Sequence, residues 1–255
     1  MCPVSLHHVS CVVYPSLMLS LIPTPIGNLR DITLRALDIL KTSDLILCED
    51  TRRTQKLLTA YEIQKPLMSF HEHTGPERVQ DILQRLRENQ SIALVSDAGT
   101  PLISDPGFEL VHEVIKHKLP LEVLPGPSAM MTALVASGLA VDSFSYFGFL
   151  PQKSAARKKE LMKWETREET LLFYESPHRL VTVLEDMKDI LGDREAVVAR
   201  ELTKKFEEVA RGTLTELIKK FSSKSVLGEI VLVVSGKGRK QLFSVQRSAS
   251  GKPNE

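Results

Sequence analysis

Residues 92–107 read IALVSDAGTPLISDPG, a short apolar run followed directly by a polar, turn-forming loop. The first four residues are typical of a buried strand, and the glycines and prolines after them favour turns. Because open α/β sheets bind ligands beyond the carboxyl ends of their strands, this loop predicts a ligand site. It contains two glycines and two aspartates but no lysine, which disfavours a phosphate-binding loop of the G-x-x-x-x-G-K-[ST] type.

The same alternation of apolar runs and amphipathic segments extends over residues 19–124. Strands are predicted at 19–24, 45–48, 67–70, 92–95 and 121–124, and helices at about 33–40, 54–58, 76–87 and 108–117. We expect Asp31 to N-cap the first of these helices. The pattern indicates βαβ units and therefore an α/β fold with a mainly parallel sheet.

A domain boundary is predicted at the sequence LPGPSA, residues 124–129, where a helical run rich in Met, Ala and Leu begins. Beyond it, strands are predicted at 144–149, 170–174, 196–200, 207–211 and 230–234, and helices at about 155–164, 178–190 and 214–221. The two strands near residues 200 and 208 indicate a hairpin and hence a mixed sheet. The predicted organisation is an N-terminal extension at 1–18, an N-terminal α/β domain at 19–125, a C-terminal α/β domain at 126–236 and a disordered tail at 237–255.

Composition restricts the class of protein. The chain has 255 residues, 42% of them hydrophobic, and a net charge of +1, so it can bury a large core and must bind any nucleic acid through a local basic patch. Cys2, Cys11 and Cys48 form no C-x-x-C, which favours a reducing, cytoplasmic location over a disulfide framework or a zinc site. No apolar run reaches the about 18 residues of a membrane span. No Lys or Arg precedes Arg30, so we expect residues 1–18 to be an upstream start or a disordered extension, not a signal peptide.

Polar or turn-forming residues follow four successive predicted strands. They are TPIGN at 24–28, EDTRRT at 49–54, HEH at 71–73 and SDAGTP at 96–101. Since the carboxyl ends of parallel strands share one edge, this convergence predicts a ligand cleft. Asp50 could instead only cap a helix. His71 and His73 could hold a metal if they point the same way on an extended segment, but without a further ligand at matching spacing a polar or base-binding role is favoured.

The second half carries charged residues at strand ends and one basic window. The window, QKSAARKK at 152–159, either binds a polyanion or is the solvated start of a helix. Charged groups also follow predicted strands at 174–179 and 199–208. Neither G-x-S-x-G nor G-x-G-x-x-G is present, which disfavours a hydrolase and a classical dinucleotide-binding site.

Eight motifs, in this order, resemble those of the ribosomal small-subunit methyltransferase I family of the tetrapyrrole methylase superfamily. They are PTPIGNL, EDTRRTQKLL, FHEH, SDAGTPLISDPG, LPGPSA, GFLP, FYESPHRL and ARELTKKFEE. The resemblance implies a two-domain, usually homodimeric methyltransferase that binds S-adenosylmethionine in a cleft between its domains. The implied reaction is methylation of the ribose 2′-hydroxyl of the decoding-centre cytidine 1402 in 16S rRNA. The stretch before Met18, and an end soon after Val234 where some relatives carry a helical extension, depart from the family pattern.

The resemblance and the strand-end positions together nominate site residues. The implied cofactor contacts are Pro25, Ile26, Gly27, Asp97, Ala98, Gly99, Thr100, Ile103, Ser128, Ala129 and Leu150. Candidates for the general base are His71, Glu72, Glu175, Glu201 and Lys204, and candidates for RNA contacts are Arg52, Arg53, Lys153, Arg157, Lys158, Arg179, Arg200 and again Lys204. Methyl transfer from a sulfonium chiefly needs alignment of hydroxyl, methyl and sulfur, so no metal is expected.

In the loop SDAGTP we expect main-chain groups and the Asp97 carboxylate to bind the methionine end of the cofactor, and Asp105 to act as a turn and helix cap. Two other functions stay open. One is methylation of a small molecule such as a tetrapyrrole by an enzyme of the same fold. The other is a non-catalytic RNA-binding assembly protein, which would show no thermal shift with S-adenosylmethionine.

Overall fold

The computed structural model of the chain describes residues 18–223 and 226–239. Its contacts divide the chain into two compact units. Unit 1 contains Ile32–Gly126 and the chain up to Thr24, and unit 2 contains Pro25–Asp31 and the chain from Pro127. Residues 25–31, which the sequence predicted to belong to the N-terminal domain, therefore group with unit 2. Most of the expected N-terminal extension (residues 1–17) and of the expected tail (residues 240–255) lies outside the described residues.

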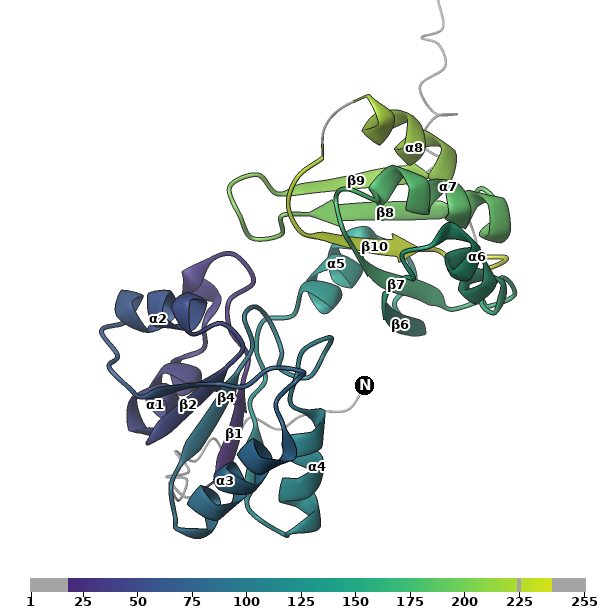
Figure 1. Ribbon diagram of the computed structural model, residues 1–255. Coiled ribbons are helices and arrows are strands. Elements are labelled where there is room, and N and C mark those ends of the chain that lie inside the picture. Colours follow the sequence, from purple (N-terminus) through teal and green to yellow (C-terminus); the bar gives the residue numbers. More distant parts are fainter. Residues whose placement is uncertain (1–17, 224–225, 240–255) are drawn as a thin grey trace, which may run out of the picture. The chain divides into compact units, whose positions relative to one another are not determined.

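Unit 1 is a parallel sheet with helices on both faces (Figure 1). Its elements are β1 (Leu19–Ile22), α1 (Leu34–Thr42), β2 (Leu45–Cys48), α2 (Thr51–Ala60), β3 (Leu67–Ser69), α3 (Pro76–Arg87), β4 (Ile92–Val95), α4 (Phe108–Lys116) and β5 (Leu121–Val123). The strand order is β3-β2-β4-β1-β5, and every described pair is parallel. The predicted parallel α/β sheet is therefore confirmed.

The strands of unit 1 are apolar on both faces because helices cover both. Leu45 and Leu47 of β2 pack with α3 and α4, whereas Ile46 and Cys48 pack with α1 and α2. Successive side chains of a strand point to opposite faces, so one run of four apolar residues supplies two cores. This is why the strands read as continuous apolar runs in the sequence.

Unit 2 is built on a mixed sheet. Its elements are α5 (Ala129–Ser137), β6 (Phe144–Phe149), α6 (Ser154–Met162), β7 (Thr170–Glu175), α7 (Leu180–Leu191), β8 (Glu195–Arg200), β9 (Glu208–Thr213), α8 (Leu214–Ser222) and β10 (Ile230–Val234). The strand order is β6-β7-β10-β8-β9; β6 and β7 are parallel and the other pairs are antiparallel. The predicted hairpin of β8 and β9 and the mixed sheet are confirmed.

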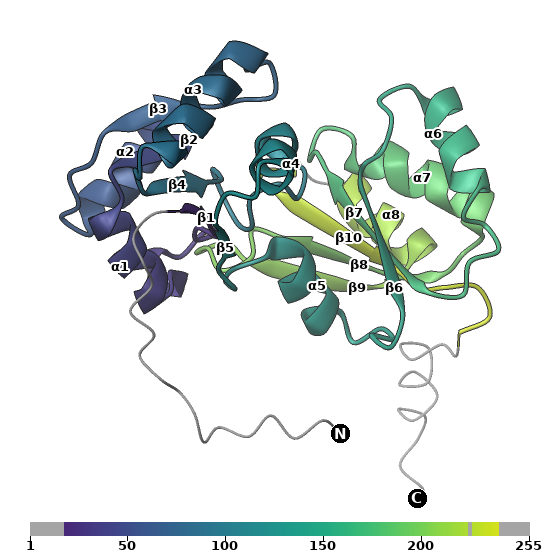
Figure 2. The ribbon, with the colours of Figure 1, turned by 90° about the horizontal axis from the view of Figure 1, so that it is seen from below.

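The two faces of this sheet are covered unequally. Figure 2 shows α6, α7 and α8 on one face and α5 on the other. Leu172, Val197 and Val231 face α5, and Ile26 from the segment Pro25–Asp31 packs in the same cluster. An apolar residue from before the first helix of unit 1 thus becomes part of the second core.

Two helix starts differ from the sequence prediction. Asp31 lies in a short 3-10 turn, Leu29–Asp31, and the cap of α1 is Thr33, whose hydroxyl accepts the Ala36 N–H at 3.1 Å. The N-cap of α4 is Gly107, which has a φ of +127°, so Asp105 does not cap that helix. A glycine fits there because it tolerates a positive φ.

Within residues 18–223 and 226–239, no helix combines the length and the apolar character that crossing a membrane requires.

Candidate functional site

The strand-end loops of unit 1 bind one another at the carboxyl edge of its sheet. Thr24, just after β1, and Gly99, in the loop after β4, each donate an N–H to the other's carbonyl at 2.9 Å. The Thr24 hydroxyl donates to the Ser96 carbonyl at 3.0 Å, and the Ser96 hydroxyl donates to the Gly99 carbonyl at 2.7 Å. Gly99 has a φ of +85°, which favours glycine. These hydrogen bonds hold the loop to the end of β1, and the Gly99 N–H is already used.

Asp97 connects this loop to the end of β2. One carboxylate oxygen accepts the Asp50 N–H at 3.1 Å, and the other lies 3.4 Å from Arg53 Nη1. The carboxylate has further lone pairs, so it can accept a donor from a ligand as well. Ala98, next to it, is exposed.

Asp50 caps α2. Its carboxylate accepts the Arg52 N–H at 2.9 Å and pairs with the Arg52 guanidinium at 3.0 Å. These hydrogen bonds from Arg52 hold the pKa of Asp50 at about 2. Asp50 is thus ionised, and Arg52 and Arg53 remain largely exposed beside it, with side chains 87% and 61% accessible.

Asp105 is a second carboxyl group beneath the same loop. Burial, followed by the charges of Glu49 and Asp97, raises its pKa to about 6, and a hydrogen bond to the Ser96 side chain only partly offsets this. Four carboxyl groups therefore lie near the ends of β2 and β4, an arrangement that favours a cationic ligand. The sequence showed each carboxylate but not the burial that perturbs Asp105.

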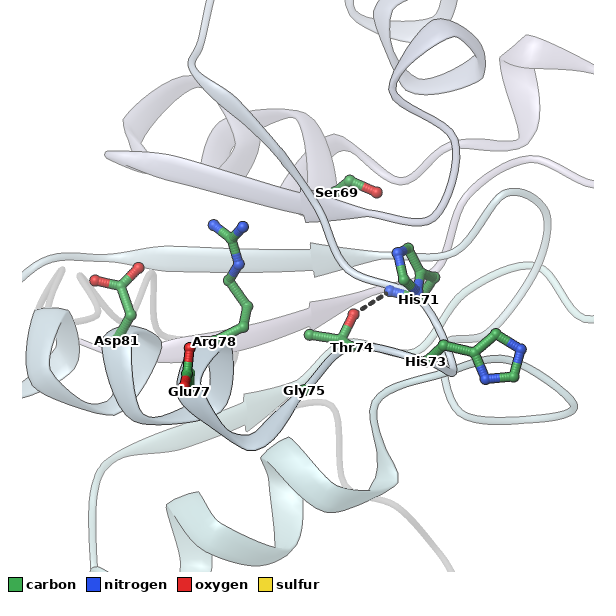
Figure 3. A pocket seen from close by; sticks show the side chains of 8 residues that line it. All are labelled: Ser69, His71, His73, Thr74, Gly75, Glu77, Arg78 and Asp81. Atoms are coloured by element: carbon green, nitrogen blue, oxygen red, sulfur yellow. Dashed lines mark hydrogen bonds between the residues drawn. The ribbon is translucent and has the colours of Figure 1, made fainter.

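A hollow of about 500 Å³ lies beside the end of β3 (Figure 3). Its lining residues are Ser69, His71, His73, Thr74, Gly75, Glu77, Arg78 and Asp81. The expectation of an extended HEH segment is wrong, because residues 72 and 73 form a turn: Thr74 N–H donates to the His71 carbonyl at 2.9 Å, and the Thr74 hydroxyl accepts the His71 N–H at 2.8 Å. The two histidine rings lie 6.4 Å apart, and both side chains are exposed, as is Glu72. Over the described ranges, no three His, Cys, Asp or Glu side chains gather as a metal site would require.

In unit 2, the segment Pro25–Asp31 packs against the loop between β8 and β9. A Cβ on Gly27 would collide with Lys204 Cγ and lie 2.9 Å from the Leu202 carbonyl oxygen, so the chain can approach this closely only at a glycine. Asn28 N–H donates to the Thr203 hydroxyl at 3.1 Å. The structure thus brings the predicted cofactor position Gly27 next to the predicted base Lys204.

Lys204 and Glu201 form an ion pair in this loop. Lys204 Nζ lies 2.9 Å from Glu201 Oε1 and 3.0 Å from Glu229 Oε2. Burial lowers the pKa of Lys204, but the hydrogen bonds to the two carboxylates outweigh it and leave the pKa above its ordinary value. The hydrogen bond from Lys204 lowers the pKa of Glu201. A lysine that keeps its proton and a carboxylate of lowered basicity are both poor general bases.

Two candidate arginines and Glu175 are held inside unit 2. Arg157 is 3% exposed, so its predicted role in RNA binding is wrong: its guanidinium pairs with Asp186 and donates to the Pro151 and Gln152 carbonyls at 3.1 and 3.0 Å. The Glu175 side chain is fully buried and pairs with Arg179 at 2.6 Å. A carboxylate in that position offers no exposed oxygen to a substrate, which argues against Glu175 as the base.

The remaining nominated residues differ in their exposure and in the number of partners that they bind. Arg200 is mostly buried and bonds to Glu208 and the Leu227 carbonyl. Lys158 pairs with Asp186 and Asp189, whose hydrogen bonds raise its pKa. Lys153 is exposed at the start of α6. Ser128 caps α5 by accepting the Met131 N–H at 3.4 Å, and Ala129 opens that helix.

Comparison with known proteins places this fold in a family. The family described as Tetrapyrrole (Corrin/Porphyrin) Methylases matches residues 18–218. Two solved structures share the fold. One is a cobalt precorrin-4 methyltransferase of cobalamin biosynthesis, with a TM-score of 0.65 and 18% identity over 89% of this chain and 98% of that one. The other is a uroporphyrin-III C-methyltransferase from Thermus thermophilus complexed with S-adenyl homocysteine, with a TM-score of 0.59 and 17% identity over 86% of this chain and 97% of that one.

Relatives of much higher identity have a narrower name. Proteins called ribosomal RNA small subunit methyltransferase I are similar to the chain: that of Bacillus subtilis is 48% identical over 88% of this chain and 77% of its own, and that of Thermotoga maritima 48% over 86% and 98%. That of Vibrio cholerae is 50% identical over 86% of this chain and 77% of its own. The chain therefore belongs to the ribosomal RNA small subunit methyltransferase I family of the tetrapyrrole methylases.

Proposed function

We propose that the chain transfers a methyl group from S-adenosylmethionine to the ribose 2′-hydroxyl of the decoding-centre cytidine 1402 in 16S rRNA. The identity of about half of the aligned residues to small-subunit rRNA methyltransferases, over 86–88% of this chain, carries this proposal. The family motifs from PTPIGNL to ARELTKKFEE support the ribose position. The substrate is then the RNA or the small ribosomal subunit in the cytoplasm, and the family pattern supports a homodimer.

For the cofactor we retain the nominated residues of both units. The carboxylates at the ends of β2 and β4 suit a cationic sulfonium. In unit 1 the Gly99 N–H is occupied, so the Asp97 carboxylate and the main chain around Ala98 are the groups that would hold the methionine end. In unit 2 we assign Pro25, Ile26 and Gly27 to the cofactor, together with Ser128, Ala129 and Leu150.

The reaction is an in-line displacement with a neutral leaving group. The protein must align the hydroxyl, the methyl carbon and the sulfur, exclude water and accept the hydroxyl proton. Of the five candidate bases, Glu175 is buried and Lys204 and Glu201 are paired, which leaves His71 and Glu72 at the exposed end of β3. For the RNA backbone we retain the exposed Arg52, Arg53 and Lys153.

The cofactor assignment predicts a specific loss of affinity. Asp97→Asn keeps the shape but removes the charge, so we expect S-adenosylmethionine to bind about tenfold more weakly, the loss of one charge-assisted hydrogen bond. Calorimetry measures this. Asp44→Asn is the matched control, since Asp44 also accepts a main-chain N–H, from Ser91 at 2.8 Å, but lies before β2, at the opposite end of that strand from the carboxyl cluster. Equal affinities of wild type and Asp97→Asn would contradict the assignment.

The substrate class is tested by competition between acceptors. Radiolabelled S-adenosylmethionine is offered with small subunits from a strain that lacks this methylation, with free nucleosides and with a tetrapyrrole. We expect label only in the subunits or their RNA. Faster transfer to a tetrapyrrole would establish the small-molecule alternative, and wild type that shows no thermal shift with the cofactor would establish the non-catalytic one.

A further inference from the structure

Three consecutive carbonyl groups directly after β6 are bound by two arginines. Arg179 Nη1 donates to the Leu150 carbonyl at 3.3 Å, and Arg157 Nη1 donates to the Pro151 and Gln152 carbonyls at 3.1 and 3.0 Å. Loop carbonyls ordinarily bind water at the surface. Here side chains from α6 and from the start of α7 fix the path of the loop.

Each guanidinium is in turn held by a buried carboxylate. Asp186 of α7 accepts Arg157 Nε at 2.7 Å, and Glu175 at the end of β7 accepts Arg179 Nε at 2.9 Å. Glu175 Oε1 also accepts the Ser176 N–H at 2.6 Å. Arginine suits this arrangement because its planar fork can bind a carboxylate and a carbonyl at once.

The Glu175–Arg179 pair uses only one of the two carboxylate oxygens of Glu175. Among the described residues, Glu175 Oε2 is buried and has no hydrogen-bond partner. A buried carboxylate oxygen without a partner costs stability, and Glu175 keeps this arrangement while its other oxygen holds Arg179. All of the observed bonds of Glu175 run through Oε1, to Arg179 and to the neighbouring main chain.

The residue that Arg179 holds is Leu150, which we assigned to the cofactor. Leu150 as a whole is 4% exposed, and its side chain lies in the apolar core, so the contact that we assign to it depends on how its main chain is held. The position of that main chain is what the Arg179 hydrogen bond fixes.

We propose that Arg179 and Glu175 are positioning residues, which hold the main chain at Leu150 in the geometry that binds S-adenosylmethionine, and that Arg179 does not contact RNA. This inference rests on the proposed function. It replaces the two roles that the sequence suggested, catalysis for Glu175 and phosphate binding for Arg179.

Two conservative variants test it. Arg179→Lys keeps a cation but lacks the fork, and Glu175→Gln keeps the shape but removes the charge that holds Arg179. For both we expect S-adenosylmethionine to bind about tenfold more weakly by calorimetry. The amide hydrogens of Phe149, Leu150 and Gln152, which flank the carbonyl that Arg179 holds, should exchange at least tenfold faster. Affinity for the small-subunit RNA and kcat at saturating cofactor should stay within about threefold of wild type.

The matched control is Arg85→Lys, since Arg85 also pairs with an acidic residue four positions earlier, Asp81, but lies in α3. Arg85→Lys should change neither the affinity for S-adenosylmethionine nor the amide exchange after β6. A phosphate-binding Arg179 predicts the opposite pattern: Glu175→Gln would leave cofactor affinity unchanged and Arg179→Met would weaken only RNA binding, and either result overturns the proposal. If wild type binds no S-adenosylmethionine, the proposed function fails, and unchanged amide exchange would separately refute the anchoring.

Discussion

Asp105 shows how an ordinary turn residue acquires an unusual charge state. It lies beneath the loop after β4, and burial together with Glu49 and Asp97 raises its pKa to about 6, compared with a reference value of 3.8. Between pH 3.8 and about 6, Asp105 therefore takes up a proton when the protein folds. Its contribution to stability is therefore fully present below pH 3.8 and is lost as the pH rises through about 6.

Asp105→Asn should consequently stabilise the protein at neutral pH. Asparagine imitates the protonated form, so we expect a gain of about 1 kcal/mol in the free energy of unfolding at pH 8, after allowance for the partial exposure of Asp105. The gain should disappear below about pH 4, where Asp105 is protonated in both states. Urea unfolding of both proteins at the two pH values measures this. A variant that is less stable at pH 8 would show that the ionised carboxylate makes a favourable contact.

At the scale of helices and strands, the start of α1 tests how local signals compete. Thr33, not Asp31, accepts the N–H of the helix. We expect Thr33→Ala to lower the free energy of unfolding by about 1 kcal/mol, and Asp31→Ala to change it by less than about 0.5 kcal/mol. Thermal unfolding decides between them, and the reverse order would restore Asp31 as the cap.

The join between α6 and α7 depends on the buried Arg157–Asp186 pair. Arg157→Met leaves Asp186 without its main partner inside the protein, so we expect a loss of about 3 kcal/mol in the free energy of unfolding. Adding Asp186→Leu removes the unpaired charge, and the double variant should recover part of that loss. A double-mutant cycle by urea unfolding measures the coupling, and strictly additive losses would show that the two side chains do not act as a pair.

These elements also show what a sequence can and cannot predict. The strands of unit 1 were predictable because apolar runs of four alternate with amphipathic helices, and the β8–β9 hairpin because two strand patterns lie close together. The cap at Thr33 was missed because a 3-10 turn precedes it. The burial of Arg157 was missed because its partner, Asp186, lies 29 residues further along the chain.

At the scale of the whole molecule, the convergence of the strand ends was predictable, but the set of side chains left free at them was not. Parallel topology brings the loops after β1, β2 and β4 together, as the motifs indicated. Which side chains remain available to a ligand depends on contacts that no local sequence pattern encodes. Asp50 caps α2, and Lys204 pairs with Glu229. Gly27 is needed for close packing against Lys204. Pro25–Asp31 likewise belongs to unit 2 because Ile26 is buried in the apolar cluster between α5 and the sheet of that unit.

The central claim is methylation of a ribose hydroxyl in small-subunit rRNA. Purified enzyme and radiolabelled S-adenosylmethionine are incubated with unmodified small subunits, and the RNA is then hydrolysed with alkali. Alkaline cleavage of a phosphodiester bond requires a free 2′-hydroxyl on the nucleotide before it. The account predicts that the label stays in an alkali-resistant dinucleotide that begins with cytidine and maps to position 1402. Label released in a mononucleotide, as methylation of a base would give, or a resistant dinucleotide from another position, would contradict it.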